Sequence, residues 1–401
     1  MNARAFLSSY ISIDRLKEIY MALSFGFLDI FAGFVAIFLL PFSKEIPWIF
    51  ILIPPLLTIR GDLNAIFSGV LTTSLHIGLM KDSFRKNTEE YYALISSIYF
   101  LGLVNSFLFA IIIGIFMNDI ILFLIIFFII NACFFLASSF SFLMTSSVSF
   151  ITFKKGYDPD VIVYPVMSTV NDIAIILILI VVIVIMEPTN IFKALLIGSA
   201  IFVATFILRI YLFQRYRRNP FFQRTLKESY IGISFSIPVS SLTGVILMEL
   251  TPLLQYFPEI LVIWPALITA VGGTGAIVAS VLDTKLYRGD LEAHFTSIMS
   301  EYGFPMIIQS LIALATYIVA LYLVGSIMVS RVLSGTSINV LFLVLISSIL
   351  SALIVYLSSI IIATYAFQKG LNPDNFTITI ITTIADFVTS FMILILSTIY
   401  I

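Results

Sequence analysis

Two copies of one acidic motif contain the residues of this chain that are best suited to chemistry. The first copy runs from Asp158 to Asp172 (DPDVIVYPVMSTVND) and the second from Asn372 to Asp386 (NPDNFTITIITTIAD). Each ends on an Asp fourteen residues after its start, and apolar sequence follows directly. Both final carboxylates therefore fall inside predicted membrane helices. Carboxylates at that depth are rare and costly, and they usually have a function.

The repeated carboxylates favour a cation site. If Asp172 and Asp386 face each other, they repel, and a divalent cation between them relieves both the repulsion and the loss of hydration. A monovalent cation would leave excess negative charge. We therefore predict Asp172 and Asp386 as metal ligands. The structural alternative is a protonated carboxylate, or one that is paired with Arg60.

Hydroxyl groups accompany both carboxylates. They lie three and four residues before each Asp, on the same helix face: Ser168, Thr169, Thr382 and Thr383. We expect them either to orient the carboxylate and hold ordered water, or to pack between helices.

The start of each motif reads mainly as a helix cap. Asp or Asn followed by Pro is a common helix start, and an acid in the first turn suits the helix dipole. At the cytoplasmic mouth the same acidic groups would also attract cations. The residues concerned are Asp158, Asp160, Asn372 and Asp374.

The composition predicts an all-α integral membrane protein. The chain is 60% hydrophobic and 11% charged, with a mean hydropathy of +1.13, whereas soluble domains carry about a quarter charged residues. Cys133 is the only cysteine, so disulfides and cysteine metal sites are excluded. Apolar stretches long enough to span a membrane number about eleven: 19–42, 48–80, 92–117, 120–152, 161–187, 191–213, 229–250, 257–284, 304–326, 338–367 and 376–401.

Two of these spans contain helix-breaking residues. Pro54-Pro55 and RGDLN (60–64) interrupt the second span, and Pro265 and GGTG (272–275) interrupt the eighth. We expect broken helices there, which membranes tolerate only against protein or a wet cavity. Backbone carbonyls at the breaks would line a pore, and tight helix packing is the alternative. The candidate pore-lining residues are Gly61, Asp62, Gly272 and Gly273.

The chain repeats itself along its length. RLKEIYMALSF (15–25) matches TLKESYIGISF (225–235) at an offset of 210, Pro54 with Gly61 matches Pro265 with Gly272 at 211, and the acidic motifs match at 214. We predict two parallel five-helix repeats, related by a pseudo-twofold axis along the membrane normal. The predicted divisions are a tail at 1–14, repeat 1 at 15–187, a linking helix and basic segment at 188–224, and repeat 2 at 225–401. As a pseudo-dimer, a single chain would suffice for function.

The basic residues predict the orientation. The segments on one side carry most of the 21 Lys and Arg residues, whereas the other side carries Lys44, Lys193 and Arg331. The positive-inside rule predicts a multi-pass protein of the cell membrane with a cytoplasmic N-terminus and an outside C-terminus.

These motifs resemble the membrane domain of the MgtE-type magnesium channels and their eukaryotic solute-carrier relatives. The resemblance rests on PPLLTIRGDLN and WPALITAVGGTG, and on the paired acidic motifs. It implies the fused two-copy form, with an ion path lined by Asp172 and Asp386. The Asn that usually follows Gly is Asp62 in one half and Gly273 in the other, and Thr379 stands opposite Pro165.

The sequence thus predicts transport of Mg²⁺ along a path between the repeats. The partners would be the lipid bilayer and the divalent cation, with no nucleic acid and no organic cofactor, and no motif indicates an enzyme. An H⁺- or Na⁺-coupled carrier that uses the same carboxylates is the alternative, and an assembly factor without transport is a third class. Channel and exchanger remain open, because they differ in conformational cycle rather than in site residues.

Overall fold

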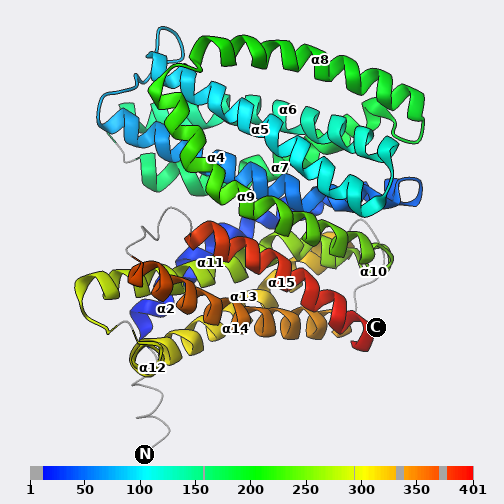
Figure 1. Ribbon diagram of the computed structural model, residues 1–401. Helices are drawn as coiled ribbons and strands as arrows, with labels where there is room; N and C mark the ends of the chain where they lie inside the picture. The colour runs from blue at the N-terminus through cyan, green and yellow to red at the C-terminus, as the bar shows by residue number, and fades with distance from the viewer. Residues whose placement is uncertain (1–11, 157–158, 293, 331–337, 370–376, 401) are drawn as a thin grey trace, which may run out of the picture. The chain divides into compact units, whose positions relative to one another are not determined.

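The computed structural model describes residues 12–156, 159–292, 294–330, 338–369 and 377–400 (Figure 1). Within these ranges the chain is helical, and the fold class predicted from the composition is confirmed. The main helices are α2 Ile13–Gly26, α3 Ile30–Ala36, α4 Ile53–His76, α5 Glu89–Met117, α6 Ile120–Lys154, α7 Pro159–Met186, α8 Ile191–Tyr216, α9 Pro220–Glu249, α10 Thr251–Tyr256, α11 Pro258–Arg288, α12 Phe295–Ile298, α13 Phe304–Ser330, α14 Ile338–Gln368 and α15 Thr377–Tyr400.

Ten helical segments among the described residues are long and apolar enough to cross a membrane. They coincide with ten of the eleven predicted spans. The remaining span, predicted at 229–250, lies on α9, where the apolar part is the shorter stretch Ile233–Glu249. Pro238 lies inside this helix.

By their internal contacts the residues form two compact units. Unit 1 comprises Met1–Leu40 and Val245–Ile401, and unit 2 comprises Pro41–Gly244. These units are not the sequence repeats, because each contains the first helix of the other repeat. Helices α2 and α3 of repeat 1 belong to unit 1, and most of α9, which opens repeat 2, belongs to unit 2.

Corresponding helices make corresponding contacts in the two units. In unit 2, α4, α6 and α7 pack against one another, and α5 packs on α6. In unit 1, α11, α14 and α15 pack against one another, and α13 packs on α14. Helix α8 is additional in unit 2 and runs along the outside of α5 and α6 (Figure 1). The helices that carry Asp172 and Asp386, α7 and α15, therefore contact equivalent helices. Helix α7 packs against α4 and α6, and α15 packs against α11 and α14.

Two glycines show that the helix exchange is reciprocal. In unit 1, a Cβ added to Gly33 would lie 1.9 Å from the carbonyl oxygen of Val262. In unit 2, a Cβ added to Gly244 would lie 2.3 Å from the carbonyl oxygen of Ile51. Both pairs are related by the same repeat offset of 211 residues. The first helix of each repeat thus lies directly against backbone of the other repeat, at Val262 near the start of α11 and at Ile51 in the segment before α4.

The predicted breaks in the second and eighth spans are wrong. Helix α4 runs without interruption through residues 60–64, and its two prolines are at its start, after a short 3₁₀ helix (Pro47–Leu52). At a helix start, proline lacks only a hydrogen bond that would not form anyway. Helix α11 likewise continues through Pro265 and residues 272–275. The glycines are therefore helical residues rather than breaks.

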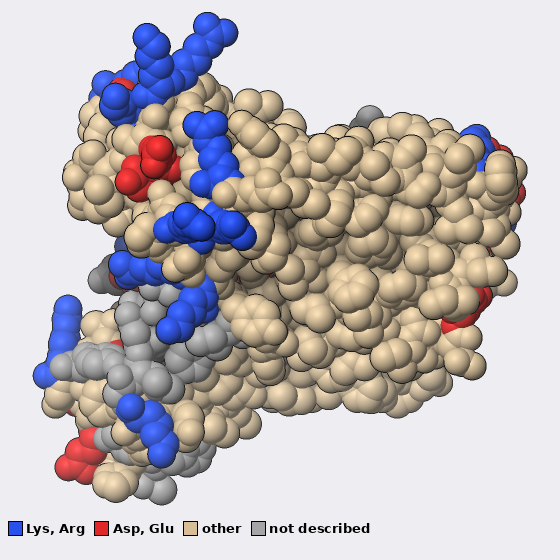
Figure 2. Space-filling model, turned by 45° about the horizontal axis from the view of Figure 1, so that its top comes forward, with Lys and Arg blue, Asp and Glu red and all other residues tan. Residues whose placement is uncertain are grey.

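Basic side chains gather at one end of unit 2 (Figure 2). Contacts join the segments at this end. Lys154 Nζ lies 3.9 Å from Asp82 Oδ2, and Tyr216 packs with Ala93 and Phe222. The segment after α4 and the ends of α6 and α8 supply Lys81, Arg85, Lys86, Lys154, Lys155, Arg215, Arg217 and Arg218.

Candidate cation site

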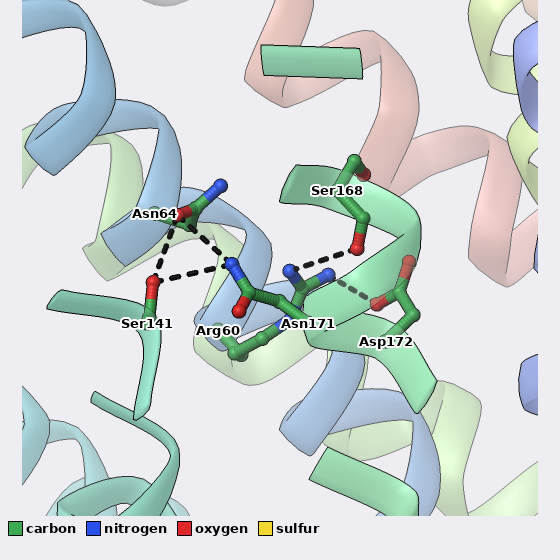
Figure 3. Close-up of polar contacts among 6 residues, drawn as sticks. All are labelled: Arg60, Asn64, Ser141, Ser168, Asn171 and Asp172. Carbon is green, nitrogen blue, oxygen red and sulfur yellow. Dashed lines mark hydrogen bonds and ion pairs between the residues drawn. The ribbon is translucent and has the colours of Figure 1, made fainter. Parts of the chain in front are cut away.

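Asp172 forms a buried ion pair with Arg60 near the middle of α7 (Figure 3). Arg60 Nη2 donates to Asp172 Oδ1, and Nη1 donates to the backbone carbonyl of Ser168 at 3.4 Å. Asp172 is 8% exposed and Arg60 is 6% exposed. The Arg60 alternative named for this carboxylate is therefore the arrangement that the structure contains.

A neutral polar network lies beside the ion pair. Asn171 Nδ2 donates to Asn64 Oδ1 at 3.0 Å and to Ser141 Oγ at 3.1 Å. Ser141 Oγ also donates to Asn64 Oδ1 at 2.9 Å, and Thr145 Oγ1 does so at 3.3 Å. Asn64 lies on α4, Ser141 and Thr145 lie on α6, and Asn171 lies on α7. The network thus joins the three helices at one level.

Helix periodicity explains why these groups meet. Arg60 and Asn64 are four residues apart on α4, so they share one face of that helix. Asn171 and Asp172 are consecutive on α7 and meet Asn64 and Arg60 respectively (Figure 3). The network leaves a cavity beside Arg60, Asn64 and Ser141, with room for about one water molecule.

Asp62 points to a different partner from its neighbour Arg60. Its side chain forms a hydrogen bond with Ser236 of α9, and its Oδ2 has no hydrogen-bond partner among the residues the structure describes. Gly61, between them, has no heavy atom within 4 Å of an added Cβ. The second helix of repeat 1 therefore directs one charge towards α7 and another towards the exchanged helix α9.

At the corresponding level of unit 1, side chains and backbone of α14 and α15 lie close to two glycines of α11. An added Cβ at Gly275 would lie 2.5 Å from Val355 Cγ1 and 3.3 Å from Ser359 Oγ. At Gly272 it would lie 3.3 Å from the Cα of Thr382 and 3.4 Å from the Cβ of Ala385. Gly272 thus serves close helix packing, the alternative considered for it, whereas Gly273 has no neighbour within 4 Å.

Two of the four predicted hydroxyls, Thr382 and Thr383, donate hydrogen bonds within their own helix. Thr382 Oγ1 donates to the carbonyls of Ile378 and Thr379 at 3.0 and 3.1 Å, and Thr383 Oγ1 donates to Thr379 at 2.7 Å. Such bonds hold the hydroxyl hydrogen against the preceding turn. On α7 it is the carbonyl of Ser168 that contacts the ion pair, and Thr169 is buried.

The predicted caps fall largely outside the described residues. The described part of helix α7 begins at Pro159. Asp158, Asn372 and Asp374 lie in the segments that the structure leaves undescribed, and so does the side chain of Asp160.

Sequence reasoning missed the neutral half of the site. Asn64, Ser141 and Asn171 were not candidates, because their equivalents in repeat 2 are Gly275, Val355 and Ala385. A search for repeated residues discards positions that differ. The signal that would have found them is the spacing of Arg60 and Asn64 on α4, together with Asn171 beside Asp172.

Comparison with known proteins indicates the family to which this chain belongs. No cluster of three or more His, Cys, Asp or Glu that could hold a metal ion occurs in the part of the chain that the structure describes. No curated protein and no solved structure matches the chain. The family MgtE, described as a divalent cation transporter, matches residues 53–182 and 264–396, which is well over half of the sequence. Each matched segment contains one acidic motif with its final Asp, and the chain therefore belongs to the MgtE family of divalent cation transporters.

Proposed function

We propose that the chain transports Mg²⁺ along a path to which each repeat contributes one carboxylate, Asp172 from repeat 1 and Asp386 from repeat 2. One observation carries the proposal: the two segments that match the family each contain this Asp at the same place in the motif. The path and its residues are inferred from that repetition.

The chemistry of Mg²⁺ suits few protein ligands. The ion dehydrates reluctantly and is usually held through one or two carboxylates, with several waters retained. Helix α7 places Asp172 about 20 Å from its first residue, since thirteen residues at 1.5 Å each separate it from Pro159. With the start of α7 at the membrane surface, as we propose, the carboxylate would lie well inside a bilayer core of about 30 Å.

The basic end of unit 2 supports an orientation. Positively charged segments are retained in the cytoplasm, so we propose that the segment after α4 and the ends of α6 and α8 are cytoplasmic. The opposite ends of α4–α7 would then face outside, and the protein would be a multi-pass protein of the cell membrane.

The test is divalent cation flux into liposomes that contain the purified protein. We expect Asp386→Asn and Asp172→Asn each to reduce Mg²⁺ flux by at least about tenfold, because each removes a carboxylate from the path. Asp82→Asn is the matched control, since Asp82 lies in the exposed segment after α4 and outside the spans. Unchanged flux in both path variants, with folded protein, would overturn the assignment of these residues.

The same assay separates the modes of transport. Flux that persists without a Na⁺ or H⁺ gradient indicates a channel or uniporter. Flux that requires such a gradient indicates an exchanger. Uptake of another solute, driven by Na⁺ or H⁺ in the absence of divalent cations, would favour the coupled carrier instead.

A further inference from the structure

A compact loop between α4 and α5 presents three basic side chains at one end of unit 2. The side chain of Asn87 shapes this loop. Its Oδ1 accepts from the backbone N–H of Lys81 at 2.8 Å, and its Nδ2 donates to the carbonyls of Lys81 and Ser83 at 2.8 and 2.7 Å. Lys86 has a φ of 57°, which few residues with a side chain adopt. The loop thus has a defined shape, with Lys81, Arg85 and Lys86 exposed.

Aromatic contacts join this loop to α5, α6 and α8. The rings of Phe84 and Phe150, on α6, have their centroids 5.2 Å apart, and the carbonyl of Phe84 accepts from Tyr92 Oη at 3.2 Å. Tyr92, on α5, packs with the cluster that contains Tyr216, the last residue of α8. The loop and the two helix ends therefore form one basic surface (Figure 2), made by Lys81, Arg85, Lys86, Lys154, Lys155, Arg215, Arg217 and Arg218.

The basic surface carries more positive than negative charge. Its eight Lys and Arg side chains are all exposed, and the acids in the same segments are Asp82, Glu89 and Glu90. Within the described part of the chain, the salt bridge on this surface joins Lys154 to Asp82. Gathered cations repel one another. Binding of an anion therefore lowers the free energy of this surface.

Membrane orientation alone does not explain this excess of charge. Helix α11 is the equivalent of α4 in repeat 2, and the segment that follows it is GDLEAH (289–294). That segment contains Asp290 and Glu292 and no Lys or Arg. The equivalent connection can therefore be made without basic residues, and the basic loop is a feature of repeat 1.

The outer face of α8 indicates which kind of anion this surface meets. Val203, Ile207 and Tyr211 are exposed and lie four residues apart, so they form one row on the helix. Arg215 is the next residue of that row, and its Nη1 donates to Tyr211 Oη at 3.3 Å. Apolar side chains that end in a tyrosine and then a cation are typical of the boundary between lipid and water. Lipid headgroups lie at this level.

We propose that the basic surface binds the headgroup of an anionic phospholipid, whose acyl chains lie along the exposed row of α8. Guanidinium groups donate paired hydrogen bonds to phosphate oxygens, and the lysines add positive charge. The inference goes beyond the proposed transport function, because it concerns a membrane ligand of unit 2 rather than the cargo.

Lipid titration of the purified protein in detergent, with a chelator present, tests the proposal. Native mass spectrometry counts the lipids bound, and phosphatidylglycerol should bind at least about tenfold more tightly than phosphatidylcholine. High salt should reduce that preference, since exposed charges are screened. Equal binding of the two lipids would overturn the proposal. Inorganic phosphate is the soluble probe: if it raises the melting temperature as much as phosphatidylglycerol does, the ligand is a free anion and not a lipid.

Double variants locate the site. R85Q/K86Q in the loop and R217Q/R218Q after α8 should each weaken phosphatidylglycerol binding by at least about tenfold, because each basic residue near an anionic surface contributes about fivefold. The matched control is K44Q/K193Q, which removes two basic residues near the starts of α4 and α8, away from the basic surface. An equal loss in this control would show that overall charge governs binding, and the site would be wrong.

Asn87→Ala distinguishes a shaped site from diffuse charge. It keeps all eight basic residues and removes the side-chain hydrogen bonds that shape the loop. We expect phosphatidylglycerol binding to weaken by about fivefold or more, with the helical content unchanged by circular dichroism. Wild-type binding in this variant would remove the loop from the site and contradict the proposal. Since the chelator excludes divalent cations, these results do not depend on whether the protein transports Mg²⁺.

Discussion

A single amide joins three helices at the candidate site. Asn171 on α7 donates to Asn64 on α4 and to Ser141 on α6, and all three side chains are buried. Buried polar groups are most harmful when only one partner is removed, because the others then stay unpaired. The network should therefore behave as a set rather than as separate contacts.

Asn171→Ala tests that cooperation. We expect it to lower the unfolding free energy by about 1–2 kcal/mol, since it leaves Asn64 and Ser141 short of a donor. The triple variant N64G/S141V/N171A copies repeat 2 and should lose less than the sum of the three single variants. Thermal melting of each protein in detergent measures this, and strict additivity would count against a cooperative network.

The Arg60–Asp172 pair could be predicted from the sequence, whereas the neutral network of Asn64, Ser141 and Asn171 could not. Repetition identified Asp172 and Asp386, and an arginine inside a span is rare enough that Arg60 was named as a partner. Spacing alone does not decide the partner of Asp172, because a carboxylate in a membrane helix can pair with an arginine or bind a cation. Only the position of Arg60 on the α7 face of α4 decides it.

At the scale of whole helices, the helix breaks predicted from proline and glycine are wrong. The sequence predicted breaks at Pro54-Pro55 and at Gly272–Gly275. Instead, the two prolines lie in the first turn of α4, and α11 continues through the glycines. Membrane helices tolerate glycine where it lets a neighbouring helix approach, as Gly272 does with α15. The number and approximate place of the long helices followed from hydropathy alone, since span length is fixed by the thickness of the bilayer.

The exchanged helices depend on two glycines. Gly33→Ala and Gly244→Ala place a Cβ within 1.9 and 2.3 Å of backbone carbonyl oxygens, which cannot rotate away. We expect each to lower stability by about 1–3 kcal/mol, through separation of the packed helices.

Gly69→Ala is the matched control for these two variants. Gly69 lies on α4 with nothing within 4 Å of an added Cβ, so alanine should be neutral or stabilise by up to about 1 kcal/mol. Melting temperatures of the three variants in one detergent provide the comparison. Equal effects at all three positions would show that helix propensity, and not close approach, governs Gly33 and Gly244.

At the scale of the whole molecule, the helix exchange makes the halves depend on each other. Unit 2 takes most of α9 from the second half of the chain, and unit 1 takes α2 and α3 from the first half. The sequence revealed the repeat but not the exchange, because an offset relates positions in the chain and does not say which copy a helix packs against.

Cutting the chain between Arg218 and Asn219, at the connection between α8 and α9, tests this dependence. We expect the two pieces to yield a stable complex when they are expressed together, because every described helix is then present. Either piece alone should aggregate or self-associate, since it lacks a helix that its unit requires. Size-exclusion chromatography in detergent measures both results, and a stable monomer of the first piece would contradict the expectation.

The contact between Asp62 and Ser236 carries a consequence for genetics. These residues lie in different halves of the coding sequence, yet they share a hydrogen bond inside one unit. A substitution at Ser236, in the second half, should therefore change the surroundings of Asp62 in the first half. Screens that sort variants by sequence half will assign such alleles to the wrong site, whereas sorting them by contact unit will group Ser236 with Asp62, Arg60 and Asp172.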